Sequence, residues 1–351
     1  MPDIELRFHK DMLVLSAPID AVLARQGIDV VRDRQYLNLM EPDAIRDALN
    51  MEVMAGAQCL VATTEDITRA RLAHVLMDGD AARLADAAVR IAGDLKPQHL
   101  LVEIGPCGLP LDAASKASLN ENRAQYADAA RAFDGLEFDA FFLNGFANVA
   151  DLKCALMGVS QVSGKPVFAS VTLAEQSSSA QRSGVRAQDA AQRTLQTPDE
   201  SVLENLPVGS AFSGYSLVDV PKLTNPLKNA VMPADKWPEV LAVMEDLGAA
   251  VVGFETAEQL DCAVRYAATA VEQTSLPVLA QLRVTEGASR RARAGLVPLE
   301  ERGDYAIDTM ERVATKLFAT GVQFVRAAGG ATPSYTGALA ATLYGVDVLP
   351  R

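Results

Sequence analysis

Short runs of apolar and β-branched residues recur along the chain, and longer segments with helical periodicity separate them. Eight of these runs are candidate strands, at residues 12–17, 59–63, 100–104, 140–143, 167–173, 249–254, 278–282 and 322–327. The segments between them repeat apolar residues three or four positions apart, which is typical of a helix that packs one face on a sheet. The candidate helices are residues 42–55, 69–92, 119–132, 149–162, 237–247, 257–270 and 305–319.

The alternation of strands with helices predicts the class of the fold. Strands that are apolar along nearly their whole length are typical of parallel sheets that helices cover on both faces. Eight strands in this alternation predict a closed parallel (β/α)₈ TIM barrel. A doubly wound open sheet is the alternative, but the even number of strands and the length of the chain favour the barrel.

One segment interrupts the alternation. Residues 175–232 are rich in Ser, Gln, Asn and Pro and contain no candidate strand, although residues 185–195 have the pattern of a helix. We therefore expect a single barrel domain over residues 1–351 with an insertion at 175–232. The insertion follows the fifth strand, so we expect it at the carboxyl ends of the strands, either as a lid or docking arm or as a surface elaboration.

Composition and charge narrow the class of partner. The formal net charge of -13 repels a polyanion, which argues against nucleic acid. No apolar run approaches the roughly 20 residues of a membrane span, and the N-terminus lacks a basic stretch followed by an apolar one. The four cysteines are scattered, which favours reduced thiols. We expect a cytoplasmic protein that binds a small-molecule substrate, and neither nucleic acid nor a membrane.

The most informative local motif follows the last candidate strand. Gly329 and Gly330 end the apolar run, and Thr332-Pro333 opens a helical segment. Glycines at such a turn let the backbone approach a ligand closely, and the free N–H groups of a helix start face it.

This turn and three other motifs resemble the homocysteine S-methyltransferase family. The other motifs are Tyr36-Leu37-Asn38-Leu39, Ile104-Gly105-Pro106-Cys107-Gly108 and Lys165-Pro166-Val167-Phe168-Ala169-Ser170-Val171-Thr172. They occur in the family's order and, apart from the insertion, span nearly the whole chain. The resemblance implies a TIM barrel of one-carbon metabolism that transfers a methyl group to homocysteine. The donors that it implies are a methylcorrinoid charged by methylfolate, betaine or a sulfonium compound.

The resemblance also implies a zinc ion, which three cysteines hold and which lowers the pKa of the substrate thiol. With Thr332-Pro333 aligned, Ala328 and Gly329 take two of the cysteine positions, and Thr256 takes the third. All three thiolate ligands are therefore absent, and we expect no metal at this site. The expected reaction is methyl transfer without the family zinc, between a small methylated donor and a corrinoid or folate carrier, and the partner is a corrinoid carrier protein.

Acidic and polar residues stand at the strand ends instead. The candidate catalytic residues are Glu103, Glu255, Asn144 and Cys107. The candidate substrate-binding residues are Asp20, Glu65, Thr256, Arg326, Gly329 and Gly330. Clustered carboxylates raise one another's pKa and can act as general acid or base. In the alternative interpretation Glu103 and Glu255 form ion pairs with arginines such as Arg326, and Cys107 is a packing residue.

A second basic feature is a loop after the seventh strand with Arg283, Arg290, Arg291 and Arg293. Four arginines can clamp a carboxylate or phosphate, or dock an acidic partner. The alternative is a solvated loop with ion pairs to its own glutamates.

Two other functions remain open at this point. One is a non-catalytic barrel that binds a ligand or a partner, which is expected if every strand-end carboxylate is paired with an arginine. The other is a homocysteine S-methyltransferase that activates its thiol by another route.

Overall fold

A computed structural model describes residues 3–175, 230–284 and 307–343, and the structural statements below refer to these residues. The described strands and helices belong to one compact unit, Met1–Ala174 with Ala230–Arg351. A second unit, Glu175–Asn229, lies outside the described residues except for Glu175. The helix expected at residues 185–195 and three of the four loop arginines also lie outside them.

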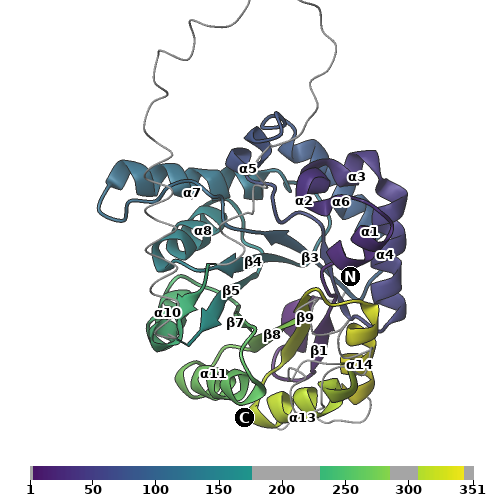
Figure 1. Cartoon of the computed structure of the whole chain (residues 1–351). Helices are drawn as coiled ribbons and strands as arrows, with labels where there is room; N and C mark the ends of the chain where they lie inside the picture. The colour runs from purple at the N-terminus through teal and green to yellow at the C-terminus, as the bar shows by residue number, and fades with distance from the viewer. Residues whose placement is uncertain (1–2, 176–229, 285–306, 344–351) are drawn as a thin grey trace, which may run out of the picture. The chain divides into compact units, whose positions relative to one another are not determined.

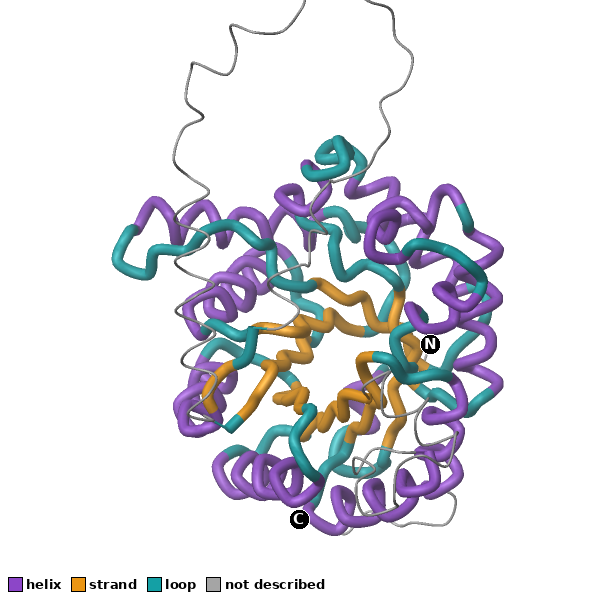
Figure 2. Tube along the Cα trace, viewed as in Figure 1, coloured by secondary structure: helices purple, strands orange, loops and turns teal. Residues whose placement is uncertain are grey.

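Eight parallel strands form a closed barrel (Figures 1 and 2). They are β1 (Leu13–Leu15), β2 (Cys59–Ala62), β3 (His99–Ile104), β4 (Ala140–Phe146), β5 (Val167–Ala174), β7 (Val251–Thr256), β8 (Val278–Val284) and β9 (Phe324–Gly329). Neighbours in the barrel follow the chain order, and β9 pairs with β1 to close it. The short β6 (Met232–Pro233) pairs with the end of β5. The predicted TIM barrel is confirmed.

Helices surround the barrel on its outside, as Figure 2 shows. The longer ones are α4 (Pro42–Met54), α6 (Ala81–Gly93), α7 (Lys116–Arg131), α8 (Val149–Val162), α10 (Trp237–Asp246), α11 (Leu260–Gln273), α13 (Met310–Thr320) and α14 (Pro333–Leu343). The shorter ones, α1 (Asp20–Arg25), α2 (Val30–Asp33), α3 (Leu37–Met40) and α5 (Arg69–Ala73), lie in connections that follow strands. None of the described helices is long and apolar enough to cross a membrane.

The single helix predicted over residues 69–92 is wrong. The chain forms α5 and α6 there, with a turn between them. Leu76 in this turn has a φ of 58°, which no residue inside a right-handed helix adopts. Asp78-Gly79-Asp80 in this connection is a turn signal, and the prediction of one helix overlooked it.

Large apolar side chains fill the barrel interior at the amino ends of the strands. Leu13, Phe142, Phe168 and Phe324 belong to this cluster, and the rings of Phe168 and Phe324 pack edge to face with centroids 5.0 Å apart. Ile4, in a 3₁₀ turn before β1, is buried in the same cluster. The barrel interior is therefore packed with apolar side chains at the amino ends of the strands, apart from the buried His99 of β3.

A close contact between helices α7 and α8 depends on Gly158. A Cβ atom on this residue would lie 2.6 Å from the carbonyl oxygen of Arg123 and 2.9 Å from Cβ of Tyr126. Real Cβ atoms do not come this close to a backbone oxygen, so a side chain here pushes the two helices apart.

We predict that Gly158→Ala lowers the free energy of unfolding by about 1–3 kcal/mol, the usual cost of overpacking. Gly93→Ala is the matched control, because Gly93 is also helical and a Cβ there meets no atom within 4 Å. The control should leave stability unchanged or raise it by up to about 1 kcal/mol through helix propensity. Urea unfolding followed by circular dichroism measures both, and equal stability of the two variants would contradict the predicted contact.

Candidate functional site

Polar side chains enter the barrel interior directly above the apolar cluster. They are Glu103 of β3, Asn144 of β4, Ser170 of β5, Gln281 of β8 and Arg326 of β9. Each follows an apolar interior residue by two positions, and alternate residues of a strand face the same side of the sheet. Five strands therefore supply one polar layer, and the structure buries all five side chains.

Four of these residues form a closed chain of hydrogen bonds, which we call the polar ring: Glu103, Asn144, Gln281 and Arg326. Arg326 donates from Nη2 to Glu103 Oε2 and from Nη1 to Gln281 Oε1, both at 3.3 Å. Gln281 Nε2 donates to Asn144 Oδ1 at 2.7 Å, and Asn144 Nδ2 donates to Glu103 Oε1 at 2.7 Å. Gln281 Nε2 also donates to Ser170 Oγ at 2.7 Å.

The guanidinium of Arg326 is held on its remaining sides as well. Its Nε donates to the carbonyl oxygen of Ser16 at 2.9 Å, and its Cζ lies 5.3 Å from the ring centroid of Phe142. Only 2% of the residue is exposed. Such a cation is stable inside a barrel because charge-assisted hydrogen bonds and an aromatic face replace its water.

Opposing effects act on the carboxyl of Glu103. Burial raises its pKa most strongly, and the nearby Glu65 raises it further. Arg326 and the hydrogen bond from Asn144 act in the other direction, and the net result is a raised pKa. Glu103 is thus a buried carboxyl that holds a proton more readily than a glutamate in water.

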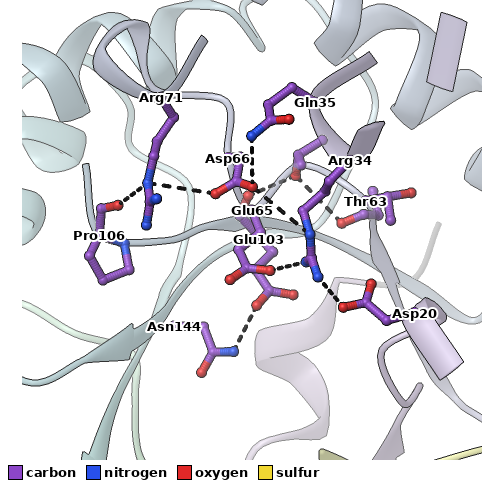
Figure 3. Close-up of polar contacts among 12 residues, drawn as sticks. Asp20, Arg34, Gln35, Thr63, Glu65, Asp66, Arg71, Glu103, Pro106 and Asn144 are labelled. Atoms are coloured by element: carbon purple, nitrogen blue, oxygen red, sulfur yellow. Dashed lines mark hydrogen bonds and ion pairs between the residues drawn. The ribbon is translucent and has the colours of Figure 1, made fainter. Parts of the chain in front are cut away.

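A second cluster lies next to Glu103, around the guanidinium of Arg34 (Figure 3). Arg34 pairs with Asp20 at the start of α1 and with Glu65 after β2, and its Nε lies 3.9 Å from Asp66 Oδ2. Burial alone would lower the pKa of Arg34, but the charges of Glu65, Asp20 and Asp66 outweigh it, and the pKa is raised. Two sequence candidates, Asp20 and Glu65, are therefore brought together.

Glycine allows this second cluster to approach β3. Gly105 N donates to the carbonyl oxygen of Glu65 at 2.8 Å, and a Cβ on Gly105 would lie 3.0 Å from Glu65 Cγ. Arg71 of α5 also connects the two loops. Its Nε lies 3.1 Å from the carbonyl oxygen of Pro106 and 3.6 Å from Asp66 Oδ1. The loops after β2 and β3 are thus joined around Glu65 and Asp66.

Both strand-end carboxylates of the alternative interpretation form ion pairs with arginines, but one of the two partners differs from Arg326. Glu255 of β7 pairs with Arg283 of β8, while Arg326 pairs with Glu103. Strand β8 lies between β7 and β9, so its Gln281 takes the contact with Arg326, and its Arg283 takes Glu255. The alternative interpretation is thus confirmed for Glu103, which pairs with Arg326, and Glu255 is also paired, but with Arg283 instead of Arg326.

The three positions that the family resemblance assigns to zinc ligands offer no thiolate. Thr256 is buried, and its Oγ1 accepts a hydrogen bond from the backbone N of Glu258 at 3.1 Å. Ala328 is also buried. Gly329 has a φ of 66°, and a Cβ there would lie 2.8 Å from Cγ of Arg283, so the arginine stem fills the space of a side chain.

The rest of the described chain does not supply a replacement set. Its structure contains no group of three or more His, Cys, Asp or Glu side chains that could hold a metal ion. Zinc sites in proteins use thiolate, imidazole or carboxylate ligands in a tetrahedral set. The side chains that the described residues place at the strand ends therefore do not form a zinc site of this kind.

Cys107 is buried and packs against residues of helix α7. The structure buries it, with Sγ 3.1 Å from Asn122 Oδ1 and its backbone N donating to Tyr126 Oη at 2.9 Å. Burial raises the pKa of the thiol, which lowers the fraction of the reactive thiolate. These contacts favour the packing interpretation over a nucleophile.

Gly329 and Gly330 form the turn that the sequence indicated. Gly330 N donates to the carbonyl oxygen of Val284 at 2.9 Å, so the turn is fastened to the end of β8. Helix α14 begins at Pro333 directly afterwards. The close approach that the two glycines permit is made by Arg283 and Val284 of β8.

Two residues of the site, Gln281 and Arg34, were not among the candidates predicted from the sequence. Gln281 is the only polar residue in the apolar run 278–282, the same signal that identified Glu103. Arg34 has no such signal, because it lies in a 3₁₀ turn within an irregular connection. Its contacts with Asp20 and Glu65 depend on how the connections after β1 and β2 fold.

Polar residues gathered at the carboxyl ends of eight barrel strands define the site of a TIM-barrel protein. The sequence profile of the homocysteine S-methyltransferase family matches residues 18–209, more than half of the chain. The chain therefore belongs to the homocysteine S-methyltransferase family, whose members transfer methyl groups. A search of curated protein sequences finds no match.

Solved structures agree on the fold. The metallated form of the homocysteine methyltransferase MmuM from Escherichia coli is similar, with a TM-score of 0.64 and 14% sequence identity. The match covers 95% of this chain and 96% of that chain. The apo form of the same protein gives a TM-score of 0.60 and 13% identity over the same shares of the two chains.

A further buried carboxyl, Glu52 of α4, joins two connections beside the site. Its Oε2 accepts hydrogen bonds from Ala17 N at 2.9 Å and from Thr336 Oγ1 at 2.6 Å. Its Oε1 has no hydrogen-bond partner in the structure, and the residue is 0% exposed. Burial raises the pKa of Glu52 to about 7, although the two hydrogen bonds and the charge of Arg326 lower it.

We predict that Glu52 makes the free energy of unfolding depend on pH. The folded-state pKa lies above the ordinary 4.5, so the folded state binds the proton more tightly. Stability should fall as pH rises from about 4.5 to about 7, and then level off. Glu52→Gln keeps the accepting oxygen and removes the charge, so its stability relative to the wild type should rise by about 2–3 kcal/mol between pH 5 and pH 8.

Urea unfolding between pH 5 and pH 8 measures this difference. Glu245→Gln is the control, because Glu245 is exposed on α10 and its replacement should leave the pH profile unchanged. Parallel profiles for the wild type and Glu52→Gln would mean that Glu52 does not titrate in this range.

Proposed function

We propose that this chain transfers a methyl group without a zinc ion and uses Glu103 to exchange a proton with the substrate. The observation that carries the proposal is a buried carboxyl with a raised pKa, at the strand ends of a barrel in a methyl-transfer family. The lack of thiolate at Thr256, Ala328 and Gly329 supports a route that does not depend on the metal.

The proposed donor is a small methylated amine, and the methyl carrier is a corrinoid or a folate. The acceptor attacks the methyl carbon, the bond from carbon to nitrogen breaks, and its electron pair stays on the nitrogen. The nitrogen takes a proton from the carboxyl of Glu103 as the bond breaks, so it leaves as a neutral amine and Glu103 is left as a carboxylate. A carboxyl with a raised pKa suits this role as general acid.

The other candidate residues have supporting roles in the proposal. Asn144 orients the carboxyl of Glu103 through its hydrogen bond. The pairs formed by Asp20 and Glu65 with Arg34, and by Glu255 with Arg283, line the strand ends where the substrate would bind. The partner in this proposal is a corrinoid carrier protein, and the location is the cytoplasm.

We expect the purified chain to transfer a ¹³C-methyl group after exhaustive dialysis against a chelator. The donors to test are ¹³C-methyl-labelled dimethylglycine, betaine and methyltetrahydrofolate, and the acceptors are reduced cobalamin and homocysteine, with NMR detection. Glu103→Gln should lower the rate at least about 100-fold, the usual contribution of a general acid. Glu245→Gln, on an exposed helix face, serves as the control and should retain the wild-type rate.

Metal analysis of the same preparation completes the test. Stoichiometric zinc, with turnover that the chelator abolishes, would contradict the proposal. Transfer to homocysteine without zinc would favour the alternative in which a carboxylate activates the thiol.

A second candidate is a barrel that binds a ligand or partner without catalysis. The observation that favours it is ion pairing: Glu103 pairs with Arg326, Glu255 with Arg283, and Asp20 and Glu65 with Arg34. A carboxylate that is neutralised in this way is less available as a base. Calorimetric binding of a donor, with no transfer to any acceptor, would support this function over the first.

A further inference from the structure

Gln281 passes the donor chemistry of Arg326 on to the other hydrogen bonds of the polar ring. A guanidinium can only donate, so the side-chain carbonyl of Gln281 has to face Arg326. Its NH₂ group then faces the opposite way, where it donates to Asn144 Oδ1 and Ser170 Oγ. The orientation of the Gln281 amide therefore follows from the fixed chemistry of Arg326.

The same logic passes to the next amide. Because Gln281 donates to the carbonyl of Asn144, the NH₂ group of Asn144 has to face Glu103. Glu103 thus receives one donor on each carboxyl oxygen, from Asn144 on Oε1 and from Arg326 on Oε2. Two donors on one carboxyl favour its ionised form, in which both oxygens accept.

Without Gln281 the Asn144 amide loses this restraint. A rotation of the amide by half a turn would present Oδ1 to Glu103, and a carbonyl oxygen favours a protonated carboxyl that can donate to it. The other charged groups that act on Glu103 are Arg326 of β9, Glu65 after β2 and Arg34 near Glu65. These charges do not depend on the Asn144 amide, so its orientation is a separate control on the proton of Glu103.

We propose that Gln281 is a positioning residue that locks the Asn144 amide and thereby keeps Glu103 ready to give up its proton, without touching Glu103 itself. This inference deepens the proposed function and rests on it for its catalytic consequence. In the methyl-transfer reaction, Glu103 has to release a proton to the leaving nitrogen. A Glu103 that holds its proton too tightly is a weaker acid and slows that step.

The test measures the pKa of Glu103 by ¹³C NMR titration of protein labelled at the glutamate carboxyl carbon, and Glu103→Gln identifies the signal. Gln281→Leu has a similar volume but forms no hydrogen bond, and it should raise the pKa of Glu103 by at least about one unit, a ten-fold change in proton affinity. Gln281→Met is a second variant that also removes the hydrogen bonds, and its flexible side chain adapts better to small changes in packing. Ser170→Ala is the matched control, because it removes a contact of Gln281 outside the ring, and it should shift the pKa by less than about 0.3 unit.

A double substitution tests the path through Asn144. Asn144→Leu should raise the pKa of Glu103 by itself, and adding Gln281→Leu should change it little further, because residues that act through one contact are not additive. Folded Gln281→Leu and Gln281→Met proteins with an unchanged Glu103 pKa would overturn the inference. A full additional shift in the double variant would also overturn it.

The readout separates this inference from the proposed function. The titration needs no turnover, so a shifted pKa in a chain that transfers no methyl group supports the positioning role and contradicts the function. Methyl transfer by the wild type, with an unshifted Glu103 pKa in the Gln281 variants, supports the function and contradicts the positioning role. In an active chain, the pH profile of kcat should move by the same amount as the Glu103 pKa.

Discussion

The buried ion pair between Arg326 and Glu103 is the interaction on which the strand-end chemistry depends. A guanidinium with 2% exposure is costly to bury unless its donors find acceptors. Here Glu103, Gln281 and the carbonyl of Ser16 supply them, and the pair joins β3 to β9 across the interior. Removal of either partner leaves an uncompensated charge, so the rest of the polar ring is organised around this contact. The orientation of both ring amides follows from the donor chemistry of Arg326.

The fold explains why this pair can exist at the strand ends. Apolar side chains pack the lower barrel, and the alternation of the strands brings the next interior residue of each strand into a common polar layer. The chain keeps the barrel fold of the family, but the described side chains at the carboxyl ends of its strands differ from those expected of a zinc site. Gly329 and Arg283 illustrate the change, because the arginine stem occupies the space that a side chain at 329 would need. The same arginine therefore fills the space beside Gly329 and forms the ion pair with Glu255.

The sequence allowed the barrel and part of its site to be predicted. Apolar runs located all eight strands to within a few residues, since burial on both faces leaves a strong signal. Glu103 was found because it interrupts such a run, and Gln281 carries the same signal but was overlooked. Pairing partners were predictable only in part, because β8 lies between β7 and β9 and its Arg283 pairs with Glu255 in place of Arg326. Arg34 lies in an irregular connection, where periodicity gives no information, whereas the break between α5 and α6 carries a turn signal that was overlooked.

The most direct test of the central claim is a double-mutant cycle on Arg326 and Glu103, measured as the free energy of unfolding in urea with a chelator present. The variants are Glu103→Gln, Arg326→Met and the two combined. We predict a coupling of about 2 kcal/mol or more, since the double variant removes both charges, whereas each single variant leaves one charge buried. Additive losses, with no coupling, would contradict the claim that this ion pair organises the site.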